Sequence, residues 1–269
     1  MGNPKKTREK LRLLMVISAT VCVSFWGLSC QNGPPSDVMT SSTDVKAAAD
    51  RVAEADALYE GREDMNKARV AVASLRQARV ADYGNYEAAW KLARAAFYVG
   101  NRSDNDSEID DMFREGTEAG KAAVALQPNR PEGHFWLGAN YGGAAAHSTL
   151  ANLSSFQDIK GEMEAVLKID ESYQGYSAYL GLGRLYLQAP RAFGGDTAKA
   201  IEYLEKGVKL SPNNTMMRFH LAEAYREANR DAEAKKQIEM IKAATPDPKY
   251  AAEHKDAVAK ADKLLQRLR

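Results

Sequence analysis

From residue 44 to the C-terminus, apolar residues recur at the spacing of helices that bury one face. No segment of this part alternates between apolar and polar side chains, as a half-buried β-strand would. Alanine, leucine, glutamate, lysine and arginine fill the periodic segments, and proline and glycine fall between them. The pattern therefore predicts an all-α fold of successive helices.

A repeat unit is clearest near the C-terminus. It has a large, a small and an aromatic position on a first helix (A), then small and apolar positions on a second helix (B), and a closing proline. These positions are Leu221, Ala222, Tyr225, Ala234, Ile238, Ile241 and Pro246. This is the tetratricopeptide pattern, in which small residues let helices A and B approach each other and proline ends helix B because it lacks an amide donor.

The same signature recurs upstream with longer turns. It starts at Leu92, Leu137 and Leu182, with an acidic insertion expected at residues 101–111 and extra residues at 189–195. Gly183 is the small residue of the third of these units, and we expect helices A and B to touch there. An Ala-rich pair at 44–58 and 64–81 lacks the signature and is expected to cap one end, and a final helix at 250–268 the other. Residues 44–269 are thus predicted to form a degenerate tetratricopeptide-like solenoid of helical hairpins with stretched A–B turns.

The N-terminus has a different character. Basic residues cluster between positions 5 and 12, and residues 13–29 carry no charge. A basic segment followed by a short apolar core predicts a signal peptide, and the core is too short for a comfortable transmembrane helix. It ends in Gly-Leu-Ser-Cys at 27–30, which resembles a lipobox. We expect removal of residues 1–29, lipidation of Cys30 and a polar tether at 30–43.

Cysteine content and charge agree with export. Cys22 lies in the segment expected to be removed, so that only Cys30 would remain, as suits an oxidising compartment. Processing removes five of the 37 basic groups and one of the 36 acidic ones, leaving a net charge of −3 and no basic cluster for nucleic acid. Gln31 follows the expected lipidation site, where aspartate is the usual inner-membrane retention signal in many Gram-negative bacteria. We therefore expect the protein to be anchored in the outer membrane, with its helical domain facing the periplasm. A single-pass anchor and a plain signal peptide are the alternatives.

Two parts of the chain resemble the T-component (TatT-like) family of TRAP transporters. They are residues 132–141 with 163–170, and residues 182–196 with 199–206. The resemblance implies a periplasmic lipoprotein that assists solute uptake by binding the transporter's solute receptor or the ligand itself. General tetratricopeptide scaffolds share much of the pattern, so a periplasmic scaffold for envelope protein assembly is the alternative function.

Residues suited to catalysis or metal binding are sparse. The four histidines lack metal-ligand spacing, and we expect His134 and His220 to pack partly buried. The acidic residues of 104–111 lack the central glycine and terminal glutamate of a calcium loop and are expected to precede a helix. Asp196 is predicted to cap a helix after a tight turn, and Gly142 and Gly143 to allow close helix packing. No nucleophile–base set is evident, so we expect neither an enzyme nor a cofactor or metal site.

Binding is the better candidate function. One face of each helix A lines the concave surface of a tetratricopeptide stack, and its predicted members here are Trp90, Arg94, Phe135, Leu180, Arg184 and Phe219. An apolar stripe flanked by two arginines suits a small amphipathic or carboxylate-bearing ligand or a partner helix. The alternative is that the inserted turns bury the stripe as ordinary core. The sequence leaves a homo-oligomer open.

Overall fold

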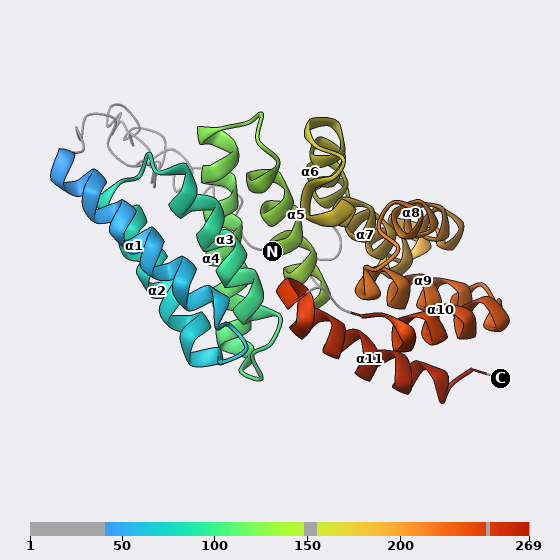
Figure 1. The fold of residues 1–269 in the computed structure, drawn as a ribbon. Coiled ribbons are helices and arrows are strands. Elements are labelled where there is room, and N and C mark those ends of the chain that lie inside the picture. Colours follow the sequence, from blue (N-terminus) through green and yellow to red (C-terminus); the bar gives the residue numbers. More distant parts are fainter. Residues whose placement is uncertain (1–40, 148–154, 246–247, 269) are drawn as a thin grey trace, which may run out of the picture. The chain divides into compact units, whose positions relative to one another are not determined.

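The computed structural model describes residues 41–147, 155–245 and 248–268 (Figure 1). Within these ranges all regular elements are helical. The helices are α1 (Ser42–Glu60), α2 (Met65–Ala81), α3 (Tyr86–Gly100), α4 (Asp106–Leu126), α5 (Pro131–His147), α6 (Ser155–Ile169), α7 (Tyr173–Gln188), α8 (Thr197–Leu210), α9 (Thr215–Glu227), α10 (Asp231–Ala243) and α11 (Ala251–Leu265), with short 3-10 turns η2 (Arg191–Phe193) and η3 (Pro248–Tyr250).

Successive helices form hairpins, and this confirms the predicted all-α solenoid. Each helix from α1 to α10 packs against the next along the chain. The A helices of the repeats, α3, α5, α7 and α9, also contact one another in that order. The Ala-rich pair is α1 and α2, and the predicted C-terminal helix is α11, which packs against α9 and α10 (Figure 1).

Glycines set the closest helix approaches. A Cβ atom added to Gly183 in α7 would lie 2.4 Å from Leu204 Cγ in α8, so helices A and B touch there as expected. A Cβ on Gly143 would lie 2.2 Å from the Phe113 ring. The expectation for Gly142 is wrong, because nothing lies within 4 Å of its added Cβ. Neighbouring helical residues point about 100° apart, so only one of the two glycines faces α4.

The turns are shorter or more structured than the sequence predicts. Residues 101–111 do not form an insertion, because α4 already begins at Asp106 and only 101–105 lie between the helices. The side chain of Asn105 caps this helix by accepting from Glu108 N. Asp106 and Glu108 stand in its first turn, where carboxylates interact favourably with the helix dipole. Asp196 caps α8 as predicted, accepting from the amides of Ala198 and Lys199.

One turn has an unusual backbone. Gln174, Gly175 and Tyr176, at the start of α7, have φ of 49°, 64° and 65°. Three successive left-handed residues are costly for side chains with a Cβ, so surrounding contacts must hold this turn. Tyr250 Oη donates to Gln174 Oε1 at 3.2 Å, which joins η3 to the turn.

Several predictions fall on residues outside the described ranges. They are the signal peptide (1–29), the lipidation site Cys30, most of the tether (30–43) and the closing Pro246. Among the described helices, none combines the length and apolar character needed to cross a membrane.

Candidate functional site

The six predicted surface residues lie on consecutive A helices, and we call the side of these helices that carries them the A-helix face. Its members are Trp90 and Arg94 on α3, Phe135 on α5, Leu180 and Arg184 on α7, and Phe219 on α9. Trp90 is 9% exposed and Phe219 is 5% exposed, whereas Phe135 and Leu180 are half-buried. The stripe therefore belongs to the core at both ends and is partly accessible in the middle.

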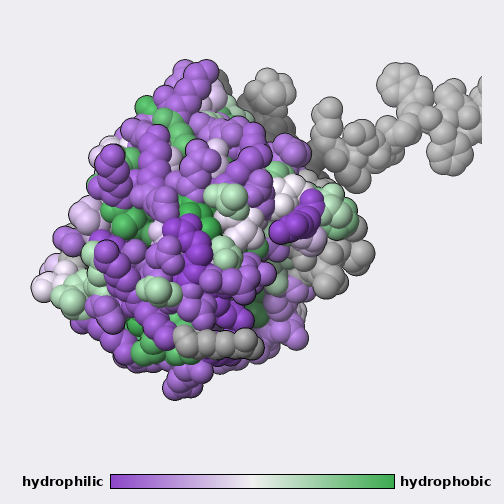
Figure 2. Space-filling model, turned by 90° about the vertical axis from the view of Figure 1, so that its right-hand side faces the viewer, coloured by the Kyte–Doolittle hydropathy of each residue, from purple (hydrophilic) through white to green (hydrophobic). Residues whose placement is uncertain are grey.

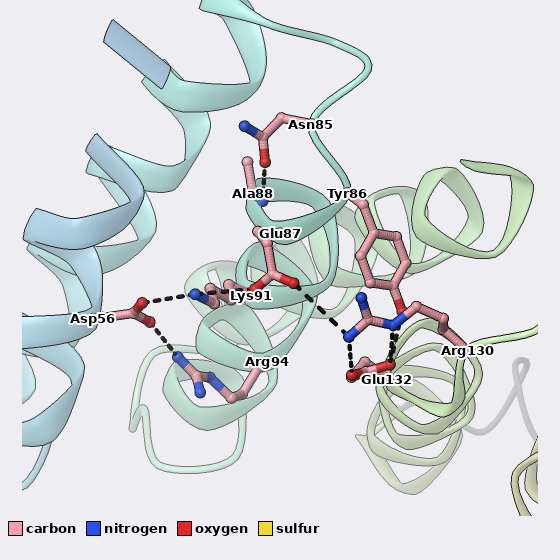
Figure 3. Close-up of polar contacts among 9 residues, drawn as sticks. All are labelled: Asp56, Asn85, Tyr86, Glu87, Ala88, Lys91, Arg94, Arg130 and Glu132. Atoms are coloured by element: carbon pink, nitrogen blue, oxygen red, sulfur yellow. Dashed lines mark hydrogen bonds and ion pairs between the residues drawn. The ribbon is translucent and has the colours of Figure 1, made fainter. Parts of the chain in front are cut away.

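Arg94 is held by partners within the chain (Figure 3). Its guanidinium lies 4.0 Å from the Tyr59 ring centroid and 5.0 Å from that of Trp90. It also donates to Asp56 Oδ1 of α1 at 3.2 Å, and Lys91 pairs with the other oxygen of Asp56 at 2.7 Å. Through these contacts the guanidinium of Arg94 joins α3 to α1, and its charge is paired within the chain.

A second part of this network joins α3 to α5 (Figure 3). Arg130 forms an ion pair with Glu132 at 2.6 Å, and Tyr86 Oη donates to the same carboxylate at 3.0 Å. Glu87 lies 4.0 Å from Arg130, and Asn85 caps α3 by accepting from Ala88 N. Burial and the charge of Glu132 raise the pKa of Tyr86. The network is structural, because its charges are matched internally.

Phe135 stands at the middle of the A-helix face. Its ring makes edge contacts with Trp136 at 5.0 Å and with Tyr173 at 5.4 Å between centroids. Tyr173 opens α7 just before the left-handed turn, and burial raises its pKa to about 12. The aromatic residues here therefore pack against one another and leave part of Phe135 exposed.

Arg184 has a different environment from Arg94. Its Nε is buried without an acceptor, like that of Arg94, but within the described part of the chain no carboxylate reaches ion-pair distance of Arg184. Burial lowers the pKa of Arg184, and the charge of Glu223 only opposes this. Glu223 instead contacts His220 Nδ1 at 2.7 Å. Burial lowers the pKa of His220 to about 4, so it is neutral near pH 7.

Helix α11 contributes a residue that sequence reasoning missed. Lys260 Nζ lies 6.0 Å from the Phe219 ring centroid, so α11 covers the A-helix face at α9. Burial and then the charge of Arg184 lower the pKa of Lys260. The sequence does show that Ala257, Ala261 and Leu264 share one helix face, but it does not show which surface receives that face.

The N-terminal half of α11 reaches the first repeats. Glu253 pairs with Arg62, in the turn after α1, at 3.2 Å. Asp256 pairs with Arg102, in the turn after α3, at 2.8 Å. Both contacts join residues more than 150 positions apart, so no local pattern in the sequence indicates them.

The face drawn in Figure 2 offers fewer features. Figure 2 shows the side of the molecule that lies to the right in Figure 1, where hydrophilic side chains predominate and apolar ones form small separate groups. The described residues hold no group of three or more histidine, cysteine, aspartate or glutamate side chains arranged to bind a metal. The A-helix face with Arg184 and its cover by α11 is therefore the strongest candidate site for binding.

Comparison with known proteins supports this architecture. The model of the family "Regulator of microtubule dynamics protein 1-3" (RMD1-3) matches residues 51–188, just over half of the chain. The chain belongs to the RMD1-3 family. A tetratricopeptide repeat model matches residues 194–261 of this RMD1-3 member. Neither match is to the T-component of TRAP transporters, so that resemblance stays a prediction.

Solved structures show the same fold. TTC0263, a tetratricopeptide protein of Thermus thermophilus, has a TM-score of 0.57 at 19% identity, over 79% of this chain and 100% of its own. PilF of Pseudomonas aeruginosa has a TM-score of 0.53 at 16% identity, over 84% of this chain and 93% of its own. Among curated proteins, none matches this chain. The RMD1-3 member is thus a tetratricopeptide-type helical scaffold, an architecture suited to binding proteins.

Proposed function

We propose that this RMD1-3 family member is an exported, lipid-anchored scaffold that binds a protein partner through its A-helix face. The observation that carries the proposal is Arg184. Arg184 is half-buried, and its carboxylate neighbour Glu223 does not form an ion pair with it. This arrangement costs free energy of folding, because no ion pair offsets the desolvation of the guanidinium. Proteins accept such costs mainly at functional sites, and an anionic group of a partner would supply the ion pair that Arg184 lacks.

The partner we propose is a periplasmic solute-binding receptor of a TRAP transport system. The resemblance of residues 132–141 and 182–196 to the T-component family motivates this choice. A small amphipathic or carboxylate-bearing solute would meet the same arginine and the half-buried Phe135. The RMD1-3 family is named for regulation of microtubule dynamics, a role that also concerns a protein partner.

Arg184→Met tests the partner proposal. The substitution keeps an unbranched side chain that can fill the space of the arginine stem, and it removes the charge. We therefore expect unchanged or higher stability together with at least about tenfold weaker binding of the receptor. Titration calorimetry with a purified TRAP solute receptor, and urea unfolding of both proteins, measure the two effects. Equal affinity of variant and wild type would contradict a role for this face. Binding of an envelope-assembly protein in place of the receptor would support the alternative scaffold function.

The anchor is proposed from the lipobox-like residues 27–30. Cys30→Ala is expected to abolish labelling with a radioactive fatty acid and to shift the protein out of the detergent-extracted membrane fraction. Equal labelling of wild type and variant would contradict lipidation at Cys30. Separation of inner and outer membranes from cells expressing the wild type tests the outer-membrane location proposed from Gln31.

A further inference from the structure

We propose that α11 is an internal occupant of the A-helix face, and that a protein partner binds by inserting an acidic amphipathic helix in its place. This inference rests on the proposed function, because it names the surface and the chemistry of the same partner. The surface lies at α9 and beside Arg184, and it ends at the turns that carry Arg62 and Arg102.

The apolar contact of α11 is narrow. Only Ala257, Ala261 and Leu264 are buried along its 15 residues. By comparison, α9 is 13 residues long and buries nine of them. Because hydrophobic stabilisation scales with the apolar area removed from water, and alanine contributes little area, α11 is held more weakly than the helix beneath it. Helices with few buried apolar contacts are the ones that open locally while the rest of a fold stays intact.

Ion pairs supply much of the specificity of this docking. The carboxylate side chains of Glu253 and Asp256 remain 33% and 46% exposed in their pairs with Arg62 and Arg102. A third pair, Lys242 with Asp262 at 2.6 Å, joins α10 to α11 and is the most exposed of the three. The guanidinium side chains of Arg62 and Arg102 are more buried, at 16% and 26% exposed. Because each of the three pairs still has a carboxylate that is partly open to solvent, salt screens it, and the docking of α11 should loosen as ionic strength rises.

The charges that remain on the surface when α11 is displaced indicate the chemistry of the partner. Displacement of α11 removes Glu253 and Asp256, and it also removes Lys260 from above Phe219 and from near Arg184. The uncovered surface then presents Phe219, which Lys260 covers, together with Arg184 and Arg102, whose charges act on Lys260. Glu223 and the neutral His220 are neighbours on α9. A replacement helix fits this surface if it repeats the design of α11, with small apolar residues at positions i, i+4 and i+7 and carboxylates on the preceding turn.

A charge exchange tests the proposal in the full chain. The probe is a fluorescein-labelled synthetic peptide of residues 248–268, and its binding is followed by fluorescence anisotropy. We expect weak binding to wild type. Arg102→Asp should bind this peptide no better, because its receiving charge is lost. Asp256→Arg should open the resident α11 and bind the peptide at least about tenfold more tightly, since apparent affinity rises with the open fraction. In the double variant the exchanged pair should close α11 and restore weak binding.

Hydrogen exchange of the α11 amides provides the second measurement. We expect faster exchange at 251–265 in Asp256→Arg and in wild type at high salt, with exchange in α9 unchanged. Glu233→Arg is the matched control, because it breaks the pair between Arg230 and Glu233 at the start of α10 and leaves α11 untouched. Peptide binding in this control should equal that of wild type.

Two outcomes would overturn the proposal. In the first, α11 exchanges as slowly as α9 in all variants and Asp256→Arg gains no affinity for the peptide, so that α11 is a permanent part of the fold. In the second, Asp256→Arg forms concentration-dependent dimers, so that the occupant is α11 of a second copy. Failure of the proposed function is distinguishable, because it appears as unchanged receptor affinity in Arg184→Met whether or not α11 opens.

Discussion

Arg102 and Asp256 are 154 positions apart in the chain, and Arg102 Nη2 donates a hydrogen bond of 2.8 Å to Asp256 Oδ2. The same guanidinium lies 4.0 Å from the ring centroid of Tyr98 on α3, which fixes its direction. In a solenoid most contacts join neighbouring repeats, so a direct contact between the turn after α3 and the last helix is unusual. It makes the C-terminal helix part of the surface formed by the first repeats.

Gly183 and Gly142 should respond in opposite directions to the same change. Gly183→Ala places a methyl group against Leu204, and overpacking of this kind typically costs about 1–3 kcal/mol. Gly142→Ala adds a methyl group in open space within α5, where alanine is favoured over glycine by about 1 kcal/mol. Urea unfolding of both variants measures the two effects. A loss of stability in both would show that α5 is also crowded at Gly142.

Phe219 and Phe135 should differ in the cost of truncation. Phe219 is buried, so Phe219→Ala is expected to lose about 3–5 kcal/mol through the cavity that it leaves. Phe135 is half-buried with two aromatic contacts of about 0.5–1.5 kcal/mol each, so Phe135→Ala should lose less, roughly 1–3 kcal/mol. Unfolding of both variants by denaturant measures the two losses of stability. Equal losses would make Phe135 ordinary core, without a part in binding.

His220 gives the stability a dependence on acidic pH. In the folded protein burial lowers its pKa to about 4, whereas the unfolded chain takes up the proton near 6.5. Between these values only the unfolded state is protonated, so stability should fall as pH drops from about 6.5 to about 4. Urea unfolding at several pH values should show this slope in wild type and a smaller one in His220→Asn. Identical slopes would contradict a neutral buried imidazole.

His134 should act in the opposite direction. Its Nδ1 lies 2.6 Å from Glu162 and its Nε2 2.9 Å from the carbonyl of Pro128, and the contact with Glu162 raises the pKa. The folded state then holds the proton more tightly than the unfolded one. The stabilisation is fully present below about 6.5 and is lost as pH rises through the raised pKa. His134→Gln should remove this loss, and titration of the His134 ring by NMR would show directly whether its pKa exceeds the ordinary value.

Gly175 should resist substitution for a backbone reason. Its φ is 64°, and the nearest atom to an added Cβ is Ser211 Oγ at 3.7 Å, so space is available and only the conformation is strained. Gly175→Ala should therefore cost about 1 kcal/mol, the penalty of a left-handed residue with a Cβ. Gly161→Ala, in an open position of α6, is the control and should be neutral or stabilising. A neutral Gly175→Ala would show that the turn relaxes.

Local patterns in the sequence specify the helices and their order. Hydrophobic periodicity, helix caps and helix-breaking residues act within a few residues of the chain. They therefore predict α1, α2 and α11 close to their observed ends and identify Asp196 as a cap. They also identified Gly183 as a contact between helices A and B, because the repeat fixes which face of each helix meets its partner. The sequence pattern predicts the start of α4 too late, because acidic residues in the first turn of a helix resemble those of a loop.

The accessibility of the A-helix face and the pairing of its charges depend on how the helices pack in the folded protein. Trp90, Phe135 and Phe219 occupy equivalent positions in the repeat pattern. Trp90 and Phe219 are nevertheless buried and Phe135 only half-buried, because burial depends on which side chains the neighbouring helices place over each residue. Arg94 and Arg184 look alike in sequence, but Asp56 of α1 pairs with the first, and within the described residues no carboxylate pairs with the second. Burial and charge pairing depend on residues far away in the chain. Helix α11 shows this most directly, because its ion pairs with Arg62 and Arg102 arise only when the repeats have stacked.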